Sequence, residues 1–204
     1  MKKTLFLSVP VLVALLAGCS EAPNSEGKKE AGKAVAPVTG QSALFKMYQV
    51  ARAWSADIEI LKMNSIILSE VPQVPGEAGA WEATFVSPSK GLRKSWTYSV
   101  IEAQGSLHEG VFGGSEYPWS ATIAEPPFLI EAVKKDTDAA YETAKAKAGN
   151  AAAKNAGKPI SFLLESTTKY AHPVWRVIWG ESVGTANLSV FVDATTGECL
   201  ETLH

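Results

Sequence analysis

Cysteine and histidine are scarce in this sequence, which has 2 cysteines and 3 histidines among 204 residues. A disulfide framework is excluded, because Cys19 has the separate role argued below and Cys199 then has no partner in the chain. His108, His172 and His204 lie far apart, and no pair has the spacing of metal ligands. We therefore expect no metal site and no cofactor.

Catalytic motifs and an excess of positive charge are also missing. The formal net charge is −2, so we expect no nucleic-acid partner, which would need a basic stripe. The sequence has no Gly-x-Ser-x-Gly nucleophile motif and no phosphate-binding loop. A Cys–His pair of Cys199 with His172 or His204 is the remaining alternative. A small buried thiol explains Cys199 without catalysis, and a reactive thiol is the other interpretation. We predict that the chain is not an enzyme.

The N-terminus has the features of a bacterial secretion signal over residues 1–18. Two lysines at positions 2 and 3 precede an apolar stretch over residues 5–16. This stretch is shorter than the ~20 apolar residues that cross a bilayer, and its basic flank is typical of a signal peptide. The residues LAGC that end at Cys19 resemble the bacterial lipobox, which implies cleavage before Cys19 and lipidation of its thiol. An ordinary cleaved signal peptide is the alternative.

A lipidated Cys19 would attach the chain to a lipid bilayer, because the two or three acyl chains usual in such lipoproteins give stable anchoring. We expect the protein in the cell envelope, facing the periplasm or the cell exterior. Ser20 follows the cysteine where an aspartate would favour the inner membrane, so the enteric sorting pattern favours the outer membrane. Residues 19–40 are otherwise small and polar without apolar periodicity, which predicts a flexible tether.

The region 41–115 is predicted to form one helix followed by four strands. Apolar residues recur at helical spacing over 42–55, with Thr39 or Ser42 as candidate caps. Segments 58–68, 81–85, 95–100 and 106–112 are apolar or alternate with a period of two, which indicates strands. The tryptophans in the alternating strands are predicted to be core residues.

Residues 116–136 are predicted to connect two similar regions. Gly113 and Gly114 are expected to end the preceding strand. Tyr117 and Trp119 flank a proline in this segment, and exposed aromatic side chains in a loop mark a contact site. We therefore predict that Tyr117 and Trp119 are binding residues.

The region 137–204 repeats the order of one helix and four strands. An alanine-rich helix over 137–156 is expected to be capped by Asp136 or Thr137. The strands are predicted at 160–168, 175–179, 188–192 and 198–203, with a hairpin turn at 193–197. The two regions match in the order and spacing of their elements.

The second region carries a family resemblance. PVWRV at residues 173–177 and LSVFVDATTGE at 188–198 resemble the PepSY domain, in which a tryptophan-bearing strand precedes a strand that ends in Val-Asp-Ala and a glycine turn. The resemblance covers residues 137–203 and implies a cystatin-like fold of a helix packed on an antiparallel sheet. It also implies binding or inhibition, without catalytic residues. In the first region Glu102 stands where the motif has its aspartate, and the turn is shorter.

These observations predict an α+β protein of two tandem cystatin/PepSY-like units, each with one helix packed on a four-stranded antiparallel sheet. The predicted function is that of a lipid-anchored, non-catalytic binding module, which modulates or inhibits a peptidase or another envelope protein. The alternative is a small-ligand carrier with a cleft between the two units, lined by tryptophans.

Overall fold

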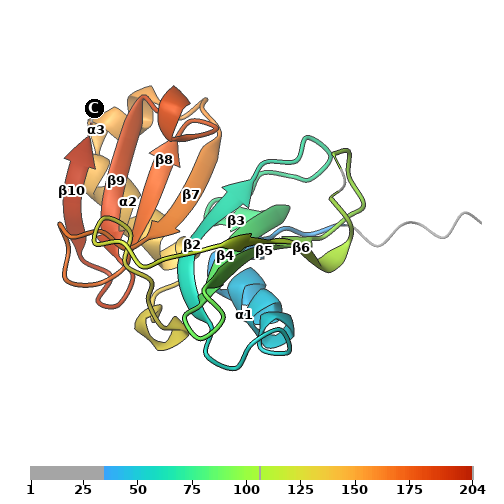
Figure 1. Cartoon of the computed structure of the whole chain (residues 1–204). Coiled ribbons are helices and arrows are strands. Elements are labelled where there is room, and N and C mark those ends of the chain that lie inside the picture. Colours follow the sequence, from blue (N-terminus) through green and yellow to red (C-terminus); the bar gives the residue numbers. More distant parts are fainter. Residues whose placement is uncertain (1–34, 106, 204) are drawn as a thin grey trace, which may run out of the picture. The chain divides into compact units, whose positions relative to one another are not determined.

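An eight-stranded antiparallel sheet, in the order β10-β9-β8-β7-β2-β4-β5-β6, dominates the computed structural model (Figure 1). The structure describes residues 35–105 and 107–203, which belong to one compact unit. The predicted signal peptide, Cys19 and most of the predicted tether lie outside the described residues. The chain is a mixed α and β protein with few helices, as predicted. Separate four-stranded sheets are not observed, because β2 and β7 pair and make the sheet continuous.

The first half of the described chain supplies one end of this sheet. Its helix begins at Gly40 and turns its apolar face, which includes Leu44 and Met47, toward β4, β5 and β6. The predicted helix ended at residue 55, whereas the observed one ends at Ala51. The elements are β1 (Val38–Thr39), α1 (Gly40–Ala51), β2 (Glu59–Ile66), β3 (Glu77–Ala78), β4 (Ala80–Ser87), β5 (Leu92–Ser99) and β6 (Gly110–Pro118).

The second half supplies the other four strands of the sheet. The single helix predicted over 137–156 is interrupted, because Gly149 has a φ of 50°, a backbone conformation outside the α-helix that glycine adopts without steric cost. Within the described residues, no helix is both long and apolar enough to cross a bilayer. The elements are η1 (Ile130–Ala132), α2 (Thr137–Ala148), α3 (Asn150–Lys154), β7 (Ile160–Glu165), β8 (Val174–Trp179), η2 (Val183–Thr185), β9 (Leu188–Asp193) and β10 (Cys199–Leu203).

The prediction that Gly113 and Gly114 end a strand was wrong. Strand β6 continues through both glycines to Pro118, so Tyr117 lies on an edge strand and not in a loop. A Cβ atom at Gly113 would lie 3.0 Å from the Trp96 indole nitrogen. The glycine therefore leaves room for the Trp96 side chain of β5, which crosses over the edge strand.

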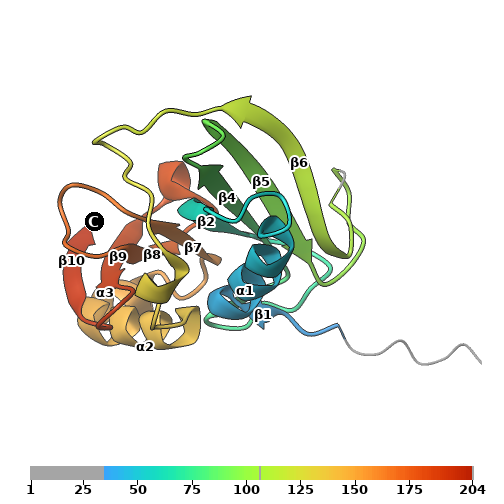
Figure 2. The ribbon, with the colours of Figure 1, turned by 60° about the horizontal axis from the view of Figure 1, so that its bottom comes forward.

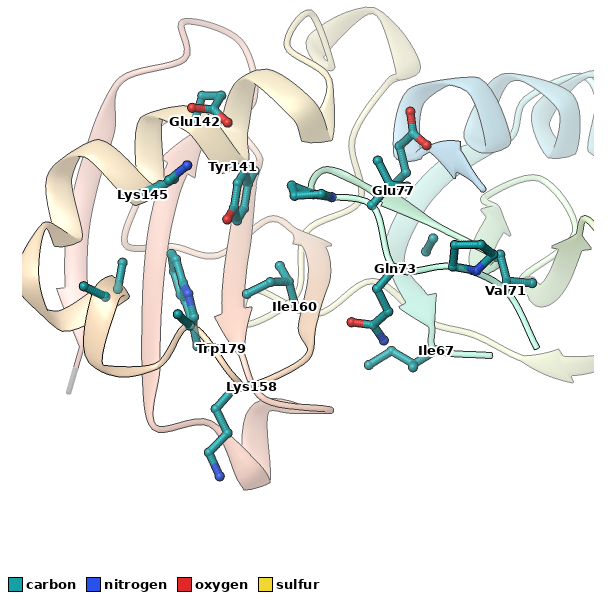
Figure 3. Close-up of a pocket in the computed structure, with 18 of the residues that line it drawn as sticks. Ile67, Val71, Gln73, Glu77, Tyr141, Glu142, Lys145, Lys158, Ile160 and Trp179 are labelled. Carbon is teal, nitrogen blue, oxygen red and sulfur yellow. The ribbon is translucent and has the colours of Figure 1, made fainter. Parts of the chain in front are cut away.

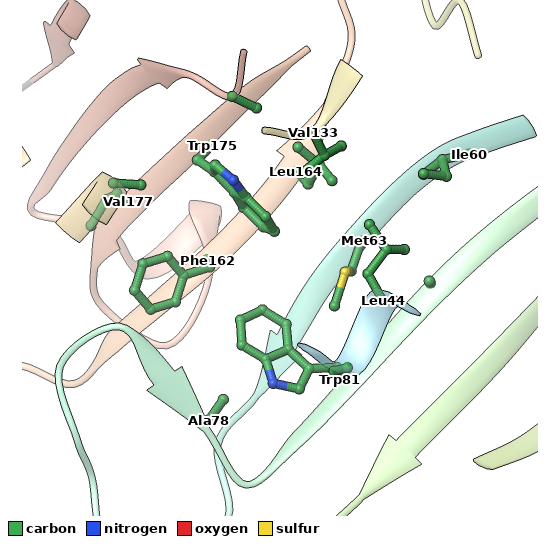
Figure 4. Packing of buried hydrophobic residues seen from close by; sticks show 14 of the residues in the cluster. Leu44, Ile60, Met63, Ala78, Trp81, Val133, Phe162, Leu164, Trp175 and Val177 are labelled. Atoms are coloured by element: carbon green, nitrogen blue, oxygen red, sulfur yellow. The ribbon is translucent and has the colours of Figure 1, made fainter. Parts of the chain in front are cut away.

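Helices α1 and α2 pack on the same face of the sheet (Figure 2) and share one hydrophobic core. Trp81 of β4 and Trp175 of β8 meet in this core, with ring centroids 6.4 Å apart at an interplanar angle of 68° (Figure 4). The Trp81 indole donates to the Val38 carbonyl at 3.1 Å, and the Trp175 indole donates to the Lys135 carbonyl at 2.8 Å. Val38 lies two positions before the first residue of α1, and Lys135 lies two positions before the first residue of α2. Trp81, Trp96, Trp175 and Trp179 are at most 3 % exposed, so the prediction that they form the core is confirmed.

The N-termini of α1 and α2 are joined by hydrogen bonds. One Asp136 carboxylate oxygen accepts from the Thr137 amide at 2.7 Å and from the Gln41 amide at 2.8 Å. The Thr137 hydroxyl accepts from the Gly40 amide at 2.8 Å and donates to the Gly76 carbonyl. Asp136 therefore caps α2 as predicted. The side chains that cap α1 come from the second half, and not from Thr39 or Ser42.

Candidate ligand-binding cleft

A cavity of about 800 Å³ lies between the two halves of the chain (Figure 3). One wall is the segment 67–79, which links β2 to β4. The other wall is made by α2, α3 and the neighbouring residues of β7 and β8. The main apolar residues of the walls are Ile67, Leu68, Val71, Val74, Ala78, Tyr141, Ala146, Ala152, Ile160 and Trp179.

The segment 67–79 is held in place by the second half. Thr137, the first residue of α2, donates its hydroxyl hydrogen to the Gly76 carbonyl. Pro72 and Pro75 restrict the backbone on either side of Gln73 and Val74, since proline fixes φ and has no amide hydrogen. A proline-rich loop anchored at one point can therefore stand beside the helix as a wall.

The opposite wall is open because its side chains are small. Ala146 and Ala153 lie at the surface of α2 and α3 and fill little of the space beside them. The larger groups here are Tyr141 and Trp179, whose rings lie 6.3 Å apart. The alanines that favour a helix in sequence thus also leave the volume of the cleft.

The charged residues of the cleft balance one another. Glu77, Glu142, Lys145 and Lys158 line it, two of each sign. The Lys145 ammonium lies 5.8 Å from the centre of the Tyr141 ring. In the described part of the chain, the buried side-chain polar atoms without a partner are Arg176 Nε and Ser189 Oγ, and neither residue lines the cleft. The walls thus combine mainly apolar surface with the polar side chains of Gln73 and Tyr141 and the four charged residues.

The predicted binding residues lie elsewhere. Tyr117 is 57 % exposed on β6, at the edge of the sheet farthest from β10. Trp119 is half-buried and its amide donates to the Gly91 carbonyl at 2.9 Å. Neither residue lines the cleft. Sequence reasoning missed the residues of the cleft, although the proline-rich segment and the alanine-rich helix were both visible as signals. Trp179 is the tryptophan of the described chain that lines it.

Each half has an aspartate that accepts several hydrogen bonds at a turn. Asp57 accepts from the Ser55 hydroxyl at 2.6 Å, the Ser89 amide at 2.8 Å and the Ser87 hydroxyl at 2.7 Å. The Ser55 bond is the largest of the effects that hold the pKa of Asp57 well below its usual range.

Asp193 occupies the predicted hairpin turn, which is confirmed. Its carboxylate accepts from the Thr195 amide at 2.7 Å and the Thr196 amide at 2.9 Å, and lies 2.9 Å from His172 Nδ1. Desolvation is the largest single effect on its pKa and raises it, but the bonds from Thr196, His172 and Thr195 together leave the pKa of Asp193 lowered.

The other predicted sites are not assembled into a centre. His108 Nδ1 lies 2.6 Å from a Glu102 carboxylate oxygen on the surface. The Glu102 carboxylate also accepts a hydrogen bond from the Glu109 amide. The bond from Glu109 and, to a smaller extent, the contact with His108 lower the pKa of Glu102. Cys199 is half-buried against the core. Across residues 35–105 and 107–203, no group of three or more His, Cys, Asp or Glu residues is placed to hold a metal ion.

Comparison with known proteins gives little similarity. No family model and no curated protein matches this chain. Among solved structures, the chain is similar to the crystal structure of a candidate lipoprotein from Clostridium difficile 630, with 7 % identity and a TM-score of 0.44 over 85 % of this chain and 95 % of that one. A similarity this low transfers neither fold nor function. The resemblance to the PepSY domain therefore remains a prediction from sequence.

Proposed function

We propose that this chain is a lipid-anchored, non-catalytic binding protein of the bacterial cell envelope, and that its cleft holds a small apolar molecule. The cavity of about 800 Å³ carries this proposal. Its volume lies within the range of ~300–1,000 Å³ that is typical of small-molecule sites, and such sites are mostly apolar. The cleft also lies between the two halves, where the carrier alternative expects a ligand.

We also propose that the halves are tandem PepSY-like units. Both have a helix followed by four strands of the sheet, and their first long strands, β2 and β7, pair at the centre. The equivalent bonds of Trp81 and Trp175 to carbonyls before the two helices support the same interpretation. In that case the cleft lies where the two copies meet.

A fluorescent phenyl-naphthylamine probe tests the cleft. The soluble chain that begins at Ser20 should bind it saturably with a rise in emission. Ala146→Trp fills the cleft and should weaken binding at least about tenfold, a change of about 1.4 kcal/mol. Ala139→Trp is the matched control, because Ala139 is also exposed on α2 but does not line the cleft. Equal binding by the Ala146→Trp variant and the unmodified chain, or no saturable binding, would reject the proposal.

A second candidate function is docking of a protein partner, such as a peptidase, on β6. This nine-residue strand is an edge of the sheet, and Phe112 and Tyr117 are 46 % and 57 % exposed on it. An exposed edge can accept an added strand, with side chains giving specificity. Trp119 contributes less exposed surface, because it is half-buried.

A photoreactive residue at position 117 tests this second function in envelope extracts. It should cross-link one protein that the same group at Lys147 on α2 does not. Purified, that protein should bind the unmodified chain more tightly than the Tyr117→Ala variant. Equal cross-linking at both positions would argue against a docking strand.

A further inference from the structure

The walls of the cleft limit the chemistry of its ligand. Leu68 and Ile160 are partly exposed and Val74 is 40 % exposed, so the walls present aliphatic surface to a ligand. A polar group of the ligand would lose its water on entering these mainly apolar walls and would find few partners there, which is costly. The part of the ligand that lies inside is therefore hydrocarbon.

The rim of the cleft is exposed and polar. Gln73 on one side and Lys145 and Glu142 on the other are exposed, so a polar group can remain in water while a hydrocarbon part is buried. Two carboxylates and two ammonium groups line the cleft, and their formal charges cancel. We therefore expect little difference in affinity between a ligand with an anionic headgroup and one with a zwitterionic headgroup.

The chain enters the fold beside the cleft. Strand β1 pairs with β3 through Val38 opposite Ala78 and Thr39 opposite Glu77, and both β3 residues line the cleft. Cys19 is the predicted lipidation site, and 15 residues, 20–34, connect it to the described chain. Fully extended, 15 residues span at most about 54 Å. If Cys19 is lipidated, the cleft stays within about that distance of a bilayer.

We infer that the ligand of the cleft is one acyl chain of a membrane lipid, with the headgroup left at the rim. This inference rests on the proposed function, that the cleft binds a small apolar molecule, and adds the class of molecule. Membrane lipids are the amphipathic hydrocarbon molecules that the tether keeps at high local concentration. Selection is by chain length, since each buried methylene contributes about 0.8 kcal/mol, or about fourfold in affinity.

A photoactivatable phospholipid tests the inference. The full lipidated protein is placed in phosphatidylcholine vesicles that contain a trace of phosphatidylcholine with a diazirine in its acyl chain. After illumination, labelled peptides should come from both walls, residues 67–79 and 141–160. Labelling should fall at least about tenfold in Ala146→Trp, a loss of about 1.4 kcal/mol of binding, and stay unchanged in Ala139→Trp.

Competition on the unmodified protein avoids any variant that fails to fold. Free fatty acids from octanoate to tetradecanoate should reduce the labelling of the walls, more strongly with each added methylene. A lysophosphatidylcholine with the same chain should compete within about threefold of the fatty acid, because the cleft has no net charge. Dependence on the headgroup without dependence on the chain would overturn the inference.

The two proposals fail in different ways. If phenyl-naphthylamine binds the cleft but the acyl probe labels only residues outside it, the acyl-chain inference is wrong and the small-ligand function stands. If neither probe reaches the cleft, both are wrong.

Discussion

The two halves have the same order of elements but depend on each other unequally. Helix α2 is capped by Asp136, which directly precedes it, whereas α1 receives its capping groups from Asp136 and Thr137 of the second half. The second half thus satisfies both helix starts. The first half has no capping side chain of its own at α1. We therefore expect the described chain to unfold in one transition.

The tryptophan pair gives the strongest test of this comparison. Trp81→Ala and Trp175→Ala should each lower the free energy of unfolding by about 3–5 kcal/mol, because each removes a buried indole and leaves a cavity. Urea unfolding followed by circular dichroism measures the loss. Similar costs would support equivalent positions in the two halves. Trp119→Ala, at the half-buried residue after β6, is the control and should cost much less.

The connection between the helix starts is tested by Thr137→Val. The valine keeps the shape of the side chain but leaves the Gly40 amide and the Gly76 carbonyl without their bonds. We expect a loss of about 2–3 kcal/mol in the free energy of unfolding, since unsatisfied buried groups are costly.

Thr143→Val is the matched control on the same helix. Its hydroxyl makes a longer bond of 3.3 Å to the Gly197 carbonyl, so its loss should be smaller. Equal losses for the two valine variants would contradict a special role for Thr137. Weaker binding of the phenyl-naphthylamine probe by Thr137→Val would show in addition that the Gly76 bond positions the segment 67–79.

The turn carboxylate of the second half predicts a dependence on pH. Because the pKa of Asp193 is lowered in the folded state, its carboxylate stabilises the fold. This contribution to the free energy of unfolding is fully present above the unfolded-state pKa of about 3.9 and is lost as pH falls through the lower folded-state pKa. Asp193→Asn should cost about 1–2 kcal/mol at neutral pH, from weakened bonds to the Thr195 and Thr196 amides. The difference from the unmodified chain should shrink in acid unfolding experiments. A difference that is constant down to low pH would exclude the charge as its cause.

The turn carboxylate of the first half should behave in the same way but more weakly. The pKa of Asp57 is lowered by the Ser55, Ser89 and Ser87 bonds, yet the group lies at the surface, where water replaces lost bonds. We expect Asp57→Asn to destabilise the protein less than Asp193→Asn does at neutral pH. Unfolding curves of both variants at neutral and acidic pH compare them directly. A larger loss of stability for Asp57→Asn than for Asp193→Asn would contradict the expectation that the turn carboxylate of the second half contributes more.

The sequence predicted those features that depend on local periodicity. The core positions of Trp81 and Trp175, the cap at Asp136 and the turn at Asp193 all follow from neighbouring residues. The continuation of β6 through Gly113 was missed, because it depends on the Trp96 side chain of the adjacent strand. The capping of α1 from the other half depends on residues more than ninety positions apart, and no local pattern encodes such a contact.

The cleft was predicted as a place but not as a set of residues. A gap between two units was one of the alternatives, with tryptophans as its expected lining. The observed lining comes from a proline-rich segment and from small alanines, whose local roles as loop and helix formers conceal their shared surface. Only the arrangement of the two halves brings Val71 and Ala146 to the same cavity.

The pairing of β2 with β7 has a consequence for solubility. Two separate four-stranded sheets would present four unpaired edges, each able to recruit a strand from another molecule and begin aggregation. Joined through Lys62–Asn64 and Leu163–Glu165, the sheet keeps two edges, β6 and β10. Strand β10 has an irregular register between Cys199 and Glu201, a feature that discourages further pairing, so β6 is the edge that remains open to another strand.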